Sequence, residues 1–111
     1  PLLSADWSGA LITWDVANKV RLSMVKAFSG PVVSLTPYRG NLVFAGGGVQ
    51  GETFDAARDD VAIRLIDVKS ARIRRTFRDH HSDSVAAMHF RGASGTLMSI
   101  GLDQQLGRHR L

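Results

Sequence analysis

The chain has 111 residues, of which 44% are hydrophobic and 22% charged, which suits one folded domain with a modest core and argues against disorder. It has no cysteine, which excludes disulfide frameworks, thiolate nucleophiles and cysteine-based zinc sites and favours an intracellular location. A net charge of +4 favours acidic partners or nucleic acid, and the apolar runs are too short for a membrane span. The start at Pro1 rather than Met suggests a fragment.

Short strands separated by turn residues are predicted along the whole chain. Residues 20–28 show the alternation of a half-buried strand, with Val20, Leu22 and Met24 set against polar neighbours. A helical stripe over three turns is absent, and the best helix candidate, residues 52–60, is barely two turns long. The chain is therefore predicted to be all-β. The other strand-like segments are 10–16, 31–35, 41–45, 61–68, 71–77, 84–90 and 96–100.

Three segments of the chain resemble one another. They are residues 4–15, the pair of pieces 44–48 and 60–67, and residues 99–110. The interval from Asp15 to Asp67 is 52 residues, and the interval from Asp67 to Arg110 is 43. The longer interval contains a Gly-rich stretch, so we interpret it as an insertion in a repeat of about 43 residues. A period of this length is typical of repeat folds.

In these features the chain resembles the WD-repeat β-propeller family, whose repeats of about 40–45 residues each form a four-stranded blade. The resemblance divides the chain into three parts. Residues 1–29 would be the last three strands of one blade, 30–79 a complete blade with an insertion near 46–59, and 80–111 the first three strands of the next. A propeller needs at least four blades to close, so we expect a slice of a longer propeller, or sheet edges that other chains cover.

In this family a His, a Ser or Thr, a turn Asp and a Trp form a hydrogen-bonded set that ties the strands of a blade together. The resemblance assigns these roles to His81, Ser99 and Asp103, with His109 in the Trp position. A His, Ser and Asp also invite comparison with a hydrolase triad. We favour the structural role, because the blade already accounts for all three residues and the chain has no G-x-S-x-G elbow.

The other two units match this set less completely. The first unit has Ser4 and Trp14, with Ser8 in the Asp position. The middle unit keeps Asp60 and Asp67, but it has apolar residues at the remaining positions, namely Phe28, Ala45 and Ile66. We expect these residues to build the blades rather than to carry chemistry, and we predict no catalytic residue, no metal site and no cofactor.

The stretch Gly46–Gly51 matches G-x-G-x-x-G, the phosphate-binding turn of dinucleotide-binding folds, and an acid, Asp67, follows a second apolar run. Only eight residues separate Gly51 from Asp60, whereas a βαβ unit needs a crossover of a dozen or more. We therefore rank a nucleotide-binding enzyme as the least favoured alternative.

The leading interpretation is a non-catalytic scaffold for other protein subunits, without a small-molecule substrate or a membrane. Loops carry function more often than the scaffold that holds them, so the insertion and the first turn supply the candidate contacts: Trp7, Phe54, Arg58 and Asp59. The alternative is an RNA-contacting propeller, in which a basic strand would touch phosphates through Arg72, Arg74, Arg75 and Arg78, helped by Arg108 and Arg110.

Overall fold

The computed structural model describes residues 2–78 and 80–111, which form ten strands and no helix. All strand pairs are antiparallel, so the predicted all-β fold is confirmed. The strands are β1 (Leu2–Ala5), β2 (Ala10–Asp15), β3 (Val20–Lys26), β4 (Val32–Pro37), β5 (Leu42–Gly47), β6 (Ile63–Asp67), β7 (Arg72–Phe77), β8 (Val85–Arg91), β9 (Thr96–Gly101) and β10 (Leu106–Arg110).

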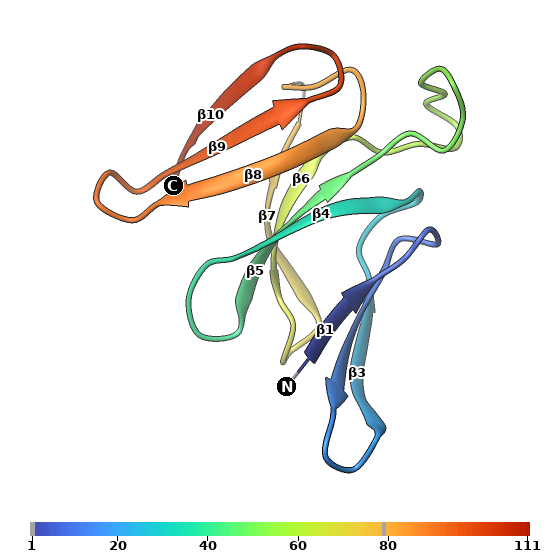
Figure 1. The fold of residues 1–111 in the computed structure, drawn as a ribbon, viewed down its shortest axis with the longest axis vertical. Helices are drawn as coiled ribbons and strands as arrows, with labels where there is room; N and C mark the ends of the chain where they lie inside the picture. Colours follow the sequence, from blue (N-terminus) through green and yellow to red (C-terminus); the bar gives the residue numbers. More distant parts are fainter. Residues whose placement is uncertain (1, 79) are drawn as a thin grey trace.

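The strands form three sheets that follow one another along the chain. The first sheet contains β1–β2–β3, the middle sheet β4–β5–β6–β7 and the third sheet β8–β9–β10, each in sequential order. Figure 1 shows the middle sheet between the other two. The sheets span residues 2–26, 32–77 and 85–110, and each lies within one of the three parts expected from the sequence repeats.

Two apolar clusters join neighbouring sheets. Between the first and middle sheets, Leu11 packs with Phe28, Ala45 and Ile66. Between the middle and third sheets, the buried residues are Phe44, Ile63, Leu65, Val85 and Leu97. Successive residues of β5 alternate between the two clusters, which is why this strand is apolar throughout, whereas the alternating apolar residues Val20, Leu22 and Met24 of β3 belong to neither cluster and are exposed.

β-Bulges recur at matching places in different sheets. In β4 the pairing skips a residue between Val32 and Ser34, and in β8 it skips one between Val85 and Ala87. Two further bulges lie in β3, opposite Thr13 and Trp14 of β2, and in β7, opposite Leu65 and Ile66 of β6. A bulge bends and twists its strand, so the sheets share local geometry as well as sequence.

Turns also recur. In the β2–β3 turn the Asp15 carboxylate accepts a hydrogen bond from the backbone N–H three residues later, at 3.2 Å, and the Asp67 carboxylate does the same in the β6–β7 turn, also at 3.2 Å. The residue after each donor has a positive φ, 55° at Lys19 and 58° at Ala71. The two turns therefore share one backbone conformation and one hydrogen bond, although their sequences differ.

Candidate functional site

Four buried side chains of the third sheet form one continuous hydrogen-bonded set. Nδ1 of His81 lies 3.2 Å from both carboxylate oxygens of Asp103, and its Nε2 lies 2.7 Å from Oγ of Ser99. Oγ of Ser99 lies 2.8 Å from Nε2 of His109. The structure thus brings together His81, Ser99 and Asp103, with His109 as the fourth member of the set.

The proton positions in this set follow from its donors and acceptors. A carboxylate can only accept, so Nδ1 of neutral His81 donates and its Nε2 accepts from the Ser99 hydroxyl. Ser99 then accepts from Nε2–H of His109, and Nδ1 of His109 is a buried acceptor without a partner among the described residues. Burial is the main cause that lowers the pKa of His109 to about 4, helped by repulsion from the His80 and His81 rings in their protonated forms, so the His109 ring is neutral at pH 7.

Asp103 also holds the turn that follows β9. Its carboxylate accepts hydrogen bonds from the backbone N–H of Ser82 at 2.8 Å and of Gln105 at 3.0 Å. Burial raises the pKa of Asp103, but these hydrogen bonds and the contact with His81 outweigh burial and leave the pKa below its usual range. A Cβ atom at Gly101 would collide with Nδ1 of His81 and with the Asp103 carboxylate, so this set requires glycine there.

The set has the residue types of a hydrolase triad, but a substrate cannot reach its serine hydroxyl. Ser99 is 1% exposed, and its Oγ is already hydrogen-bonded to a His ring on each side. A nucleophile must reach a substrate, and this hydroxyl cannot do so in the folded chain. The described residues also contain no group of three or more His, Asp or Glu side chains that could hold a metal ion. We conclude that the set stabilises the sheet.

The first sheet contains a shorter version of the set. Nε1 of Trp14 donates to Oγ of Ser4 at 2.9 Å. Ser8 stands four residues after Ser4, as Asp103 stands four after Ser99, but Ser8 is a donor in this turn. The Asp6 carboxylate, two residues earlier, accepts from the N–H and the hydroxyl of Ser8 at 2.9 and 2.6 Å and from the N–H of Ala10 at 3.2 Å.

The middle sheet replaces the polar set with apolar packing and one ion pair. Phe28, Ala45 and Ile66 lie in one apolar cluster. The Asp60 carboxylate binds the guanidinium of Arg64 at 2.6 Å, and this guanidinium lies over the Phe28 ring, 4.7 Å from its centre. Arg64 was not predicted as a site residue, because a single Arg in an apolar strand indicates an exposed side chain, and only the tertiary structure shows that it is 6% exposed.

The glycines of G-x-G-x-x-G begin inside a strand. Gly46 and Gly47 are buried residues of β5, where a Cβ atom would collide with Oγ of Ser34 at the first position and with the carbonyl oxygen of Asp60 at the second. These contacts leave no space for a pyrophosphate, and no helix follows the motif among the described residues. The glycines allow close packing, and the connection from β5 to β6 runs over residues 48–62.

Asp59 organises this connection. Its carboxylate accepts from the backbone N–H of Gln50 at 3.1 Å and of Asp55 at 3.0 Å, and from Nε and Nη2 of Arg58, both at 3.0 Å. The Arg58 guanidinium is the main reason that the pKa of Asp59 lies well below its usual range. Asp59 was predicted to contact a partner, but its side chain is 0% exposed and its carboxylate is taken up by these loop hydrogen bonds. Arg58 remains partly exposed.

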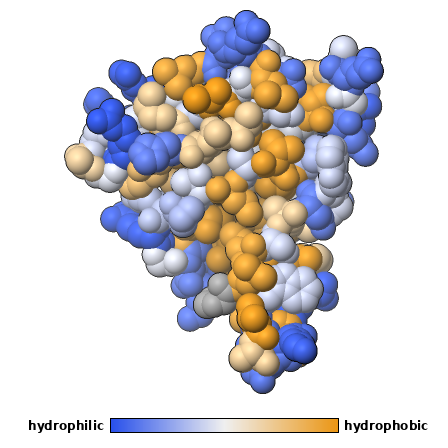
Figure 2. All heavy atoms as spheres, viewed as in Figure 1, coloured by the Kyte–Doolittle hydropathy of each residue, from blue (hydrophilic) through white to orange (hydrophobic). Residues whose placement is uncertain are grey.

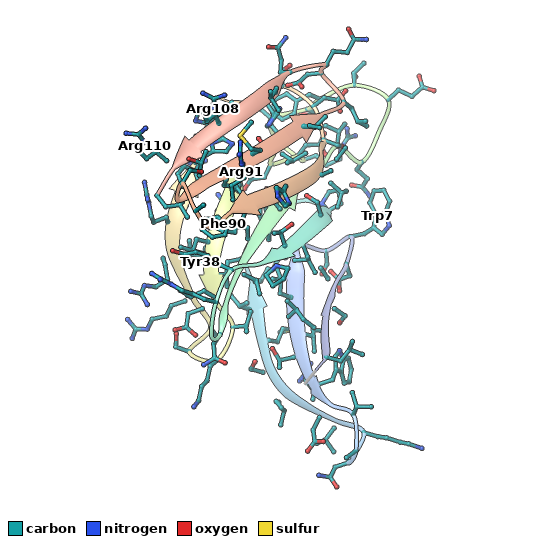
Figure 3. The ribbon with its side chains drawn as sticks, turned by 60° about the vertical axis from the view of Figure 1, so that its left-hand side comes forward. Trp7, Tyr38, Phe90, Arg91, Arg108 and Arg110 are labelled. Carbon is teal, nitrogen blue, oxygen red and sulfur yellow. The ribbon has the colours of Figure 1, made fainter. Side chains whose placement is uncertain are left out.

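A hollow of about 510 Å³ lies between this connection and the segment that enters the third sheet. Phe54 lines it from the connection, Arg78 from the end of the middle sheet, and His81 and Ser82 from the other side. Phe54 is 44% exposed and Trp7, on the β1–β2 turn, is 63% exposed. Figure 3 shows Trp7 projecting from the molecule on the side opposite the labelled arginines of the third sheet.

The basic strand β7 is the outer edge of the middle sheet, and its residues 72–76 are exposed. Its arginines have different surroundings. Arg74 lies 3.9 Å from Asp67, and Arg75 lies 4.7 Å from the centre of an aromatic ring in the same strand. Arg78 lines the hollow described above.

Comparisons with known proteins define the fold but no family. No protein-family model matches the sequence, and neither does any curated protein. The structure is similar to the crystal structure of the computationally designed Ika4 protein, with a TM-score of 0.72 and 16% identity over 98% of this chain. It is also similar to the computationally designed Ika8 protein, with a TM-score of 0.74, 16% identity and 98% coverage. The chain spans 59% of Ika4 and 30% of Ika8.

These likenesses, at 16% identity, support an all-β fold of antiparallel sheets and carry no functional assignment. Within the described part of the chain, no helix is long and apolar enough to cross a membrane.

Proposed function

We propose that this chain is a segment of a WD-repeat-like β-propeller and acts as a non-catalytic scaffold for other protein subunits of an intracellular complex. The recurring bulges and turns support a repeated blade. The hydrogen bonds that join His81 with Ser99, and Trp14 with Ser4, support the resemblance to that family. Because these polar side chains bond to one another, they hold the sheets in shape and offer no chemistry to a substrate.

The observation that carries the scaffold proposal is the exposure of two aromatic side chains on well-held loops. Trp7 is 63% exposed beside a turn that the Asp6 carboxylate closes, and Phe54 is 44% exposed on the connection that the Asp59 carboxylate closes. Large aromatic residues are favoured anchors in protein interfaces, and a loop that is ordered before binding loses less entropy.

Site-specific photocrosslinking would test this proposal. A photoreactive phenylalanine at position 7 or 54 is expected to crosslink a discrete set of proteins in cell extract. The same group at Val16, which is 62% exposed at the other end of β2, is the matched control. Equal crosslinking from all three positions would contradict the proposal. Trp7→Ala and Phe54→Ala should each reduce recovery of the same proteins in a pull-down by the full chain.

RNA binding by the β7 edge is a second candidate, supported by the exposure of residues 72–76. Phosphate contacts would make affinity fall steeply with salt, whereas an aromatic protein interface would respond much less. Anisotropy of a labelled oligouridine, measured at 50 and 200 mM salt with the parent chain and with Arg72→Gln and Arg75→Gln, decides between them. Binding that is weak at 50 mM salt or unchanged by the substitutions would dismiss this candidate.

A further inference from the structure

The third sheet has one face that points away from the middle sheet, and we call it the outward face. Leu97 packs into the core between the two sheets, so its neighbours Thr96 and Met98 on β9 lie on the outward face. Thr96 pairs with Arg91 on one side and with Arg110 on the other, and Met98 pairs with Arg108. Arg91 on β8 and Arg108 and Arg110 on β10 therefore lie on the same face, on the two strands that flank β9.

These arginines surround a small hollow. It has a volume of about 280 Å³ and is lined by the three arginines together with two hydroxyl-bearing residues and a methionine, which are Ser94, Thr96 and Met98. In Figure 3, Arg91, Arg108 and Arg110 lie together on the third sheet, on the side opposite Trp7. Guanidinium and hydroxyl groups are both donors to oxyanions, and an Arg can donate two parallel hydrogen bonds to one phosphate.

No acidic side chain among the described residues pairs with these three arginines within 4 Å. Between residues 80 and 111 the sequence has only two acids, Asp83 and Asp103. Asp103 is bound to His81, and Asp83 accepts from the backbone N–H of Ser84 at the start of β8, whereas Arg91 is the last residue of that strand. The two charge types lie at opposite ends of the sheet, so the positive charge at the hollow is not neutralised within this sheet.

The middle sheet has a face that corresponds to the outward face of the third sheet, and another sheet covers it. In the repeat, Tyr38 corresponds to Arg91, and Leu42 corresponds to Thr96. The pair Phe44–Leu65 corresponds to Met98–Arg108, with the same cross-strand register. The four middle-sheet residues all pack in the apolar core against the third sheet. The outward face replaces this apolar surface with arginines, which suits a charged ligand rather than another apolar sheet.

We propose that Arg91, Arg108 and Arg110 form a receptor for a phosphate monoester, presented as a phosphorylated serine or threonine on a protein partner. A monoester carries a charge of about −1.5 to −2 at pH 7, which matches three guanidinium groups better than the single charge of a nucleic-acid phosphodiester. The hollow is at the lower limit of small-molecule sites, so it accepts one group rather than a whole ligand. It also lacks an aromatic residue in its lining, on which single-stranded bases would stack.

The test uses the full chain and a degenerate peptide library with one central phosphoserine, immobilised beside its unphosphorylated twin. We expect retention by the phosphorylated library alone, with release by inorganic phosphate. Affinity for a selected phosphopeptide should fall about tenfold or more in Arg91→Gln, Arg108→Gln and Arg110→Gln, because each loses charged hydrogen bonds. The matched control, Arg21→Gln, removes an exposed arginine of the first sheet and should leave the affinity unchanged.

A second variant, Arg108→Lys, separates geometry from charge. It keeps the charge but loses the two-pronged donor, so it should bind more weakly than the parent chain and more tightly than Arg108→Gln. Circular dichroism and thermal melting of every variant must match the parent chain. Equal loss in Arg21→Gln, equal retention by both libraries, or tighter binding of oligouridine at the three arginines would each overturn the proposal. None of these results depends on the aromatic loops of the scaffold proposal.

Discussion

At the residue scale, Ser99 is the side chain on which the polar set of the third sheet depends, because its hydroxyl joins the two His rings. Ser99→Ala would leave Nε2 of His81 and Nε2 of His109 buried without a partner. We expect the free energy of unfolding to fall by about 1–3 kcal/mol, the usual cost of an unsatisfied buried polar group. Urea denaturation measures this value.

Ser82→Ala is the control for this substitution, because Ser82 is exposed and uses only its backbone N–H to bind Asp103. Its stability should stay close to that of the parent chain. An equal loss in both variants would mean that the hydroxyl of Ser99 contributes nothing specific.

The buried His109 predicts an acid-sensitive fold. Its pKa in the folded chain is about 4, below the ordinary 6.5, so between these values the unfolded chain binds a proton that the folded chain does not. The free energy of unfolding is therefore unaffected by protonation of His109 above pH 6.5. It falls as the pH drops toward 4, by at most about 1.4 kcal/mol per pH unit. Urea midpoints between pH 4 and 7 should show this slope, and His109→Gln should reduce it. An unchanged slope in the variant would assign it to other groups.

Some polar roles could be predicted from the sequence, and others could not. His81, Ser99 and Asp103 were found because their types and spacing follow the family pattern, and the structure brings them together. The pair of Asp60 and Arg64 was missed, since burial of an ion pair depends on contacts between sheets that a linear pattern does not contain.

At the element scale, the β6–β7 turn places Ala71 at a φ of 58°, a conformation in which a Cβ atom is unfavourable. Ala71→Gly should therefore stabilise the chain, by about 1 kcal/mol. Ala93→Gly, in the β8–β9 turn, is the control, because Ala93 has no positive φ and should only lose backbone rigidity. Thermal melting of the two variants should move in opposite directions, and a shift in the same direction would contradict the interpretation of the turn.

The β5–β6 connection should open when its central carboxylate is lost. Asp59→Asn removes the charge that holds the Arg58 guanidinium and two backbone N–H groups. We expect faster hydrogen exchange over residues 48–62 and earlier proteolysis there, with little change in the strands. Glu52→Gln changes an exposed acid of the same connection and is the control. Unchanged exchange in Asp59→Asn would show that the loop is held in another way.

The strands of this chain were easier to predict than its connections. Alternation identified β3, although its alternating apolar residues Val20, Leu22 and Met24 are exposed rather than buried. Continuous apolar runs identified β5 and β6, which are buried at successive residues. The segment 52–60 had the composition of a helix but forms only turns, because the Asp59 carboxylate takes the backbone N–H groups of the loop. The role of Gly46 and Gly47 in the strand also needed the structure, since close approach of Ser34 and Asp60 is a tertiary contact.

At the scale of the whole molecule, the first sheet has an exposed apolar face. Leu3 and Leu11 pack toward the middle sheet, so Leu2 and Met24 lie on the opposite face, where they are 55% and 50% exposed. Leu22, at the bulge, is 57% exposed. Figure 2 shows hydrophobic surface extending over the end of the molecule that the first sheet occupies in Figure 1. A surface of this kind favours association with another protein surface.

We therefore expect the isolated chain to self-associate as its concentration rises. Light scattering after size exclusion should give an apparent mass above 12.1 kDa at high concentration. The double variant Leu22→Lys, Met24→Lys should remain monomeric, because charge on this face opposes burial. Val16→Lys, on an exposed turn, is the control and should associate like the parent chain. A parent chain that stays monomeric at every concentration would contradict both this prediction and the incomplete-propeller interpretation.

The open edge formed by β7 affects whether copies of the chain can associate by pairing their strands. An unpaired strand edge is a template on which further strands can add, and repeated addition leads to fibrils. Three arginines in β7, with Arg78 just beyond it, place like charges along this edge, so a second copy of the strand would be repelled as it approached. Pairing of copies at the β7 edge is thus disfavoured, whereas association through the apolar face of the first sheet avoids this repulsion.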